Sequence, residues 1–148
     1  QQQHRLEGDP LSPIMHGYTY SGHPLACAAA VANLNIVIDD KLTNNSEEVG
    51  KYFLSRLGEL SNFPTVGDVR GLGLMLAIEF VKDKKTKDPI IPFDPYFMEI
   101  QKQCRNNGLF VRIQANKMIF SPPLIFTKQH VDEVVDTLSS ILSEIRYL

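Results

Sequence analysis

Chemistry could be carried by the stretch HGYTYSGHP, residues 16–24, which combines two glycines, three hydroxyl types and two histidines directly ahead of the apolar run LACAAAVANLNIVI. Gly17 and Gly22 permit backbone conformations that other residues avoid. Pro24 suits the first turn of a helix, where its missing N–H costs nothing. Free N–H groups, hydroxyls and a helix N-terminus together favour an anion site. The alternative is a turn and N-cap without any ligand, because small polar residues precede most helices.

Arg112 is a second candidate, in the predicted strand LFVRI. By alternation, Leu109, Val111 and Ile113 share one face of this strand, and Phe110 and Arg112 share the other. A guanidinium suits a carboxylate because it offers two parallel donors. From alternation alone, an exposed strand arginine without a ligand is the favoured interpretation.

Other reactive side chains give weaker signals. Arg70 and Glu79 flank an apolar strand, and we interpret them as a structural pair because an unpaired charge there is costly. His16 and His23 are seven residues apart, without a cysteine or carboxylate cluster, so no metal site is predicted. The two cysteines, Cys27 and Cys104, are interpreted as packing residues rather than nucleophiles.

The composition limits the function classes. With 148 residues and 43% hydrophobic content, the chain can form one ordinary domain with a core. The net charge is -2 and positive and negative residues are interspersed, so the sequence does not indicate a nucleic-acid-binding surface. No stretch of about 18 uncharged apolar residues predicts a membrane span. Two cysteines without a wider pattern favour a reducing cytoplasm. The sequence opens QQQHRLEGDPLSP, without Met, and we expect it to be the tail of a longer polypeptide.

The first half of the chain predicts two helices. Residues 25–39 are apolar on every side in their first half, which predicts a close-packed, buried helix. Residues 46–60 have amphipathic helical spacing, with Asn45 and Glu48 as a capping pair. The segment FPTVGDVRGLG follows and is interpreted as a turn-rich approach to a strand.

The second half predicts strands between helices. Residues 74–81 are expected to form a strand covered on both faces, and residues 95–107 a helix closed by Gly108. LFVRI and MIFS are expected to pair as a hairpin, before a last helix capped by Thr127. This order predicts an α+β fold with an antiparallel sheet of about three strands packed with helices. We expect residues 1–40 to be a loop and connecting helix, and residues 41–148 a small α+β domain.

Four blocks of the sequence carry a family resemblance: HGYTYSGHPLACAAAVANL, VGDVRGLGLMLAIEFV, NNGLFVR and IFSPPLIFT. In this order they closely resemble the class III aminotransferases that depend on pyridoxal 5'-phosphate (PLP). The branch that transfers amino groups from ω-amino acids or amines to pyruvate is the nearest match. The resemblance implies the C-terminal small domain of a fold type I PLP enzyme, preceded by a loop and helix from the junction with the large domain.

The resemblance also implies roles for single residues. It implies that the Thr19 hydroxyl and the main chain of Tyr18 bind the cofactor phosphate of the other subunit in a homodimer. It implies that Arg112 is a mobile group that pairs with a substrate carboxylate and swings away for uncharged amines. The ornithine and acetylornithine branch carries a carboxylate-binding arginine just ahead of its two prolines. This chain has Phe120 in that place, which favours ω-type substrates.

The Schiff-base lysine of the family lies upstream of the TYSGHP loop, and no lysine precedes Lys41 here. The sequence therefore predicts no catalytic residue in this chain, which alone should be inactive. The parent protein is expected to transfer an amino group from an amine or ω-amino acid to pyruvate or another keto acid. A stand-alone small domain used for binding or assembly is the alternative.

Overall fold

A computed structural model of the chain describes residues 17–91 and 93–147. The chain divides into two compact units, residues 1–36 and 37–148, whereas the sequence predicts the boundary between residues 40 and 41. The described elements in chain order are α2 (Pro24–Asp39), α3 (Leu42–Glu59), the 3-10 helix η1 (Leu60–Asn62), β1 (Val66–Leu72), β2 (Met75–Phe80), α4 (Pro95–Asn106), β3 (Arg112–Gln114), β4 (Lys117–Phe120) and α5 (Lys128–Glu144).

The sheet has four antiparallel strands in the order β1-β2-β4-β3. The predicted α+β class is confirmed, but the sheet has one strand more than the three expected. The additional strand is β1, which lies in the segment interpreted as a turn-rich approach. Two glycines and two charged residues lower its strand propensity. Antiparallel pairing with β2, from Val66↔Phe80 to Leu72↔Met75, stabilises the strand in spite of this low propensity.

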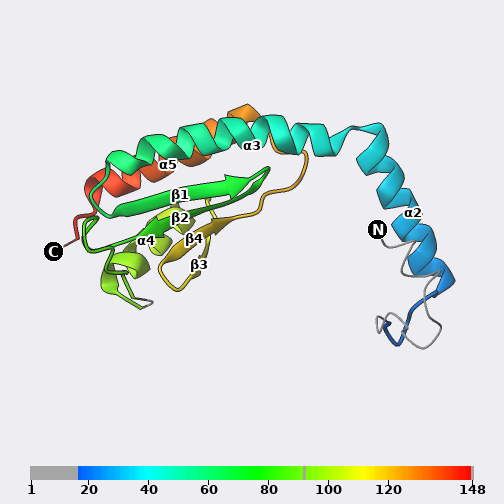
Figure 1. Ribbon diagram of the computed structural model, residues 1–148, viewed down its shortest axis with the longest axis horizontal. Coiled ribbons are helices and arrows are strands. Elements are labelled where there is room, and N and C mark those ends of the chain that lie inside the picture. Colours follow the sequence, from blue (N-terminus) through cyan, green and yellow to red (C-terminus); the bar gives the residue numbers. More distant parts are fainter. Residues whose placement is uncertain (1–16, 92, 148) are drawn as a thin grey trace. The chain divides into compact units, whose positions relative to one another are not determined.

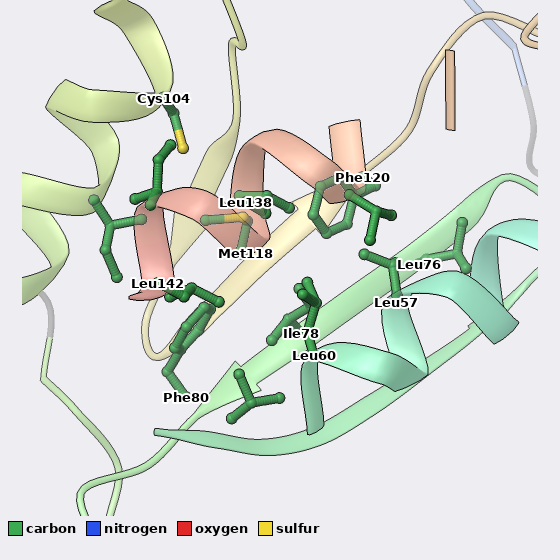
Figure 2. Close-up of a cluster of buried hydrophobic side chains, with 14 of the residues drawn as sticks. Leu57, Leu60, Leu76, Ile78, Phe80, Cys104, Met118, Phe120, Leu138 and Leu142 are labelled. Atoms are coloured by element: carbon green, nitrogen blue, oxygen red, sulfur yellow. The ribbon is translucent and has the colours of Figure 1, made fainter. Parts of the chain in front are cut away.

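One face of the sheet is buried under helices. Helices α3 and α5 lie side by side (Figure 1). Helix α3 packs on the sheet, and α4 packs against α5. Figure 2 shows side chains from these elements converging on β2 and β4. The labelled members of this core are Leu57, Leu60, Leu76, Ile78, Phe80, Cys104, Met118, Phe120, Leu138 and Leu142, all of which are buried.

The opposite face of the sheet, called the open face below, consists of exposed or half-buried side chains. It carries Asp68, Arg70, Leu72, Met75, Ala77, Glu79, Arg112, Gln114, Lys117 and Ile119. Leu72 and Met75 are 89% and 70% exposed. The expectation that residues 74–81 are covered on both faces is therefore wrong for this chain. Alternation of buried and exposed residues along β2 is typical of a sheet with one packed face.

Helix α3 begins earlier than its apolar spacing predicts. Lys41, with φ 51°, precedes it in the left-handed region, and the helix starts at Leu42. Asn45 therefore lies inside the helix, and its predicted capping role is wrong. Its side-chain amide instead donates to the carbonyl oxygens of Leu124 (2.7 Å) and Phe126 (3.0 Å). These bonds tie the start of α3 to the segment after β4.

The predicted caps at the C-terminus of α4 and at the N-terminus of α5 are confirmed. Gly108 follows α4 with φ +75°, a conformation that favours glycine. Thr127 caps α5 by accepting a hydrogen bond from the His130 backbone N–H at 3.3 Å. The His130 ring nitrogen Nδ1 accepts in return from the Thr127 backbone N–H at 3.2 Å, which completes a capping box.

Helix α2 begins at Pro24 as predicted, but none of its residues is buried. Leu25, Val31, Leu34 and Ile38 are each more than half exposed. The expectation of a buried helix is wrong within this chain, because the described residues do not cover it. Cys27 is also exposed, so its interpretation as a packing residue is not met here. None of the described helices is both long and apolar enough to cross a membrane.

Candidate functional site

Tyr18 and Thr19 lie in a hydrogen-bonded turn directly ahead of α2. The backbone N–H of Tyr18 donates to the Ser21 hydroxyl oxygen at 2.8 Å, and the Ser21 N–H donates to the Tyr18 carbonyl at 2.9 Å. Gly22, at φ +75°, then turns the chain into α2. The Thr19 side chain is exposed, and its hydroxyl has no hydrogen bond within the described residues. The turn thus presents a hydroxyl and an amide on one exposed loop, and Ser21 competes for the amide.

Arg112 opens β3 and lies on the open face, as the alternation predicts. Its neighbour across the sheet is Ile119. Its guanidinium nitrogen Nη2 donates to the Gln114 side-chain oxygen Oε1 at 3.3 Å, and both side chains are exposed. Sequence analysis missed Gln114, although its spacing places it on the same strand face as Arg112. Within the part of the chain that the structure describes, Arg112 has no carboxylate partner.

Arg70 and Glu79 form the structural pair that the sequence predicts. Arg70 Nη2 lies 2.8 Å from Glu79 Oε2, and the same guanidinium also pairs with Asp68. The hydrogen bond from Arg70 holds the pKa of the Glu79 carboxyl below its usual value. Asn116 Nδ2 donates to the other Glu79 oxygen at 3.3 Å. These carboxylates are therefore committed to an internal network on the β1 side of the open face.

Phe120, at the place of the carboxylate-binding arginine of the ornithine branch, is buried. Its ring packs edge-on against Phe53, with ring centroids 5.4 Å apart. Both residues line a hollow of about 320 Å³ whose other walls include Leu109, Phe110 and Phe126. The lining of this hollow contains no charged side chain, so no cation there could pair with a carboxylate.

Larger hollows are lined by other described residues. One of about 500 Å³ is bounded by Thr65, Tyr96 and Tyr147, one of about 570 Å³ lies along α4, and one of about 450 Å³ is bounded by Asp94, Tyr96 and Tyr147. None of these three is lined by Tyr18, Thr19 or Arg112. The volume of these hollows is therefore no reason to move the candidate site away from Tyr18, Thr19 and Arg112.

The remaining reactive groups are explained by their surroundings. Burial raises the pKa of the Cys104 thiol to about 11, which confirms a packing role and disfavours a nucleophile. No lysine among the described residues is buried. In residues 17–91 and 93–147, no group of three or more His, Cys, Asp or Glu side chains could hold a metal ion. His16 lies outside the described residues.

Comparison with known proteins decides the family. The family model described as aminotransferase class-III matches residues 5–142. The chain belongs to the class-III aminotransferases. It is 45% identical over 130 residues to the uncharacterized aminotransferase y4uB of Sinorhizobium fredii, which covers 86% of this chain and 28% of the relative. It is 36% identical over 130 residues to the putrescine–pyruvate aminotransferase of Pseudomonas aeruginosa, covering 87% and 28%.

Solved structures agree with this assignment. The chain resembles an amine transaminase from an uncultivated Pseudomonas species, solved in its PLP-bound form, with a TM-score of 0.82 and 42% identity over 88% of this chain and 30% of that one. It also resembles an (S)-enantioselective omega-transaminase from Thermomicrobium roseum, with a TM-score of 0.80 and 35% identity over 97% and 32%. The fold is thus that of part of a PLP transaminase. The chain spans less than a third of the length of these relatives.

Proposed function

We propose that this chain is the C-terminal part of a PLP-dependent aminotransferase that moves an amino group from an amine or ω-amino acid to pyruvate or another keto acid. The observation that carries the proposal is the exposed guanidinium of Arg112, which pairs with no carboxylate among residues 17–91 and 93–147, in a chain of the class-III family. A relative named for putrescine and pyruvate supports the same substrate classes.

The loop ahead of α2 fits the phosphate end of the cofactor. The Thr19 hydroxyl and the Tyr18 backbone N–H are donors of the type that binds a dianion, and the exposure of the turn leaves room for a group from another chain. The Tyr18 N–H would exchange its bond to Ser21 for one to the phosphate. When bound, PLP supplies an electron sink for the reaction. Each active site of the proposed homodimer would then use this loop from the opposite subunit.

Arg112 is proposed to bind the carboxylate of an acidic substrate. Its two parallel donors match a carboxylate, and its neighbour Ile119 offers no competing charge. The hollow at Phe120 has no arginine or lysine in its lining that could act as a second cationic anchor. These features favour substrates with one carboxylate, or with none, over 2,5-diamino acids that need a separate anchor.

The lysine that forms the Schiff base is proposed to lie in a different part of the parent protein. Such a lysine needs a partly dry site that tunes its pKa, and none of the described lysines is buried. This chain alone is therefore expected to be inactive. We also propose a cytoplasmic parent enzyme, because two cysteines without a wider pattern favour a reducing compartment.

The test compares two proteins: this 148-residue chain and the product of the complete reading frame. Each is incubated with PLP, pyruvate and an amine or ω-amino acid donor, and alanine formation is followed by chromatography. We expect alanine from the complete protein and none from the chain alone. Amino transfer by the isolated chain would contradict the proposed division of labour. A complete protein that transfers no amino group from any donor of these classes would overturn the proposed activity.

A further inference from the structure

Two arginines on the open face are held in opposite ways. Arg70, on β1, is clamped between the carboxylates of Asp68 and Glu79. Among the described residues, the Arg112 side chain, on β3, bonds only to the neutral amide of Gln114, at 3.3 Å. The same sheet face therefore contains one arginine committed to ion pairs and one that is not.

The register explains why Arg112 escapes an ion pair. Across the sheet, Arg112 lies opposite Ile119 and Gln114 lies opposite Lys117. Lys117 in turn lies opposite Glu79 on β2. The nearest carboxylate of the open face, Glu79, is therefore two strands away from Arg112. At the β3 edge of the open face, the only polar group beside Arg112 on its own strand is therefore the Gln114 amide, and the nearest charged neighbour in register is the cation Lys117 on β4.

The type of partner determines how easily the guanidinium can leave it. A hydrogen bond of 3.3 Å between an arginine and a neutral amide is long and weak. A substrate carboxylate forms shorter, charge-assisted and paired bonds to the same group, so it can displace the amide readily. A carboxylate at position 114 would instead compete with the substrate on equal terms.

We propose that Gln114 is a positioning residue that holds the Arg112 guanidinium between turnovers and thereby sets the balance between acidic and neutral substrates. This inference rests on the proposed function, because it assigns Arg112 to the substrate carboxylate. The amide keeps Arg112 out of the way of an uncharged substrate without locking it away from an acidic one.

The test uses the complete protein and two variants, Gln114→Glu and Gln114→Met, which change the charge or remove the hydrogen bond at similar side-chain size. The acceptors are pyruvate and a neutral aldehyde with the same amine donor, and the readout is the ratio of their kcat/KM values. Gln114→Glu should lower this ratio about fivefold through a higher KM for pyruvate, the upper end for exposed charge pairs. Gln114→Met should raise it about twofold, the worth of a weak hydrogen bond.

Two controls separate positioning from a structural effect. Asn62→Asp adds the same charge at an exposed position of η1 and should leave the ratio unchanged. Raising the salt concentration should restore the pyruvate KM of Gln114→Glu, because salt screens an exposed pair. Ratios that stay at the wild-type value in both variants, or that shift in the same direction, would overturn the role of Gln114 alone. A wild-type protein without transaminase activity would overturn the proposed function and this inference together.

Discussion

The contact between α3 and the β1-β2 turn gives a sharp prediction about stability. Gly50 lies in the middle of α3 and is buried. A Cβ added there would lie 2.2 Å from the carbonyl oxygen of Gly73, which is in the turn between the two strands. The turn cannot retreat freely, because the Leu74 backbone N–H is hydrogen-bonded to the Ser46 hydroxyl on α3 at 3.3 Å. Glycine at position 50 thus permits the close approach of helix and hairpin.

Gly50→Ala sets two opposing effects against each other. Alanine favours the helix by about 1 kcal/mol relative to glycine. Overpacking of a close contact costs typically about 1–3 kcal/mol, and here the obstacle is backbone more than 1 Å inside the range of ordinary contact. The upper half of that range applies to so short a contact, so after the helix gain we expect a net loss of about 1–2 kcal/mol in the free energy of unfolding. It is measured by urea denaturation followed by far-UV circular dichroism.

Gly58→Ala is the matched control in the same helix. A Cβ at position 58 would meet nothing within 4 Å, so only the helix preference acts and the variant should gain about 0.5–1 kcal/mol. Opposite signs for the two substitutions support the packing described above. A Gly50→Ala variant that gains as much stability as Gly58→Ala would refute the close approach of α3 and the hairpin.

Three further outcomes are expected. Hydrogen bonds from Tyr52 (2.7 Å) and Arg56 (3.0 Å) lower the pKa of the Asp132 carboxyl in the folded chain. The contribution of these bonds to stability is therefore present above the unfolded pKa of about 4, and it is lost as the pH falls through the lower folded pKa. Asp132→Asn should therefore weaken the acid sensitivity of urea midpoints, and an unchanged sensitivity would contradict this. Thr19→Ala in the complete protein should weaken PLP retention on dialysis without changing the circular dichroism spectrum, and equal retention would count against the phosphate role. The isolated chain should self-associate through the exposed apolar surface of α2, whereas a clean monomer at high concentration in sedimentation would argue otherwise.

Local signals predicted the last two helices well. Apolar residues at helical spacing, Gly108 after α4 and Thr127 before α5 all act within one or two turns, so the sequence alone contains the information. Within α5, Val135 is buried and Val134 is only half-buried. Both residues fit a helical spacing, and only the position of the sheet decides between them.

The errors concern groups whose partners are far away in the sequence. Strand β1 owes its conformation to β2, and Asn45 owes its role to carbonyls 79 and 81 residues later. Neither partner is visible in a local pattern. The prediction that α2 is buried was wrong for a related reason. An apolar helix surface indicates that it packs against another segment, but it does not identify that segment.

For the candidate site, alternation placed Arg112 correctly on the open face, and the cost of an unpaired charge correctly predicted the Arg70–Glu79 pair. The roles proposed for Tyr18, Thr19 and Arg112 rest on the family resemblance, because a turn before a helix and an exposed strand arginine are common in proteins of any function. Gln114 was missed, since its importance depends on which groups the register leaves beside Arg112.

The most direct test of the account is Arg112→Ala in the complete protein. Loss of a charge-assisted pair should lower kcat/KM for pyruvate at least about tenfold, while kcat/KM for a neutral aldehyde acceptor should fall far less. This selective loss is the predicted result. Equal losses for the acidic and the neutral acceptor, or no loss for either, would contradict the assignment of Arg112 to the substrate carboxylate.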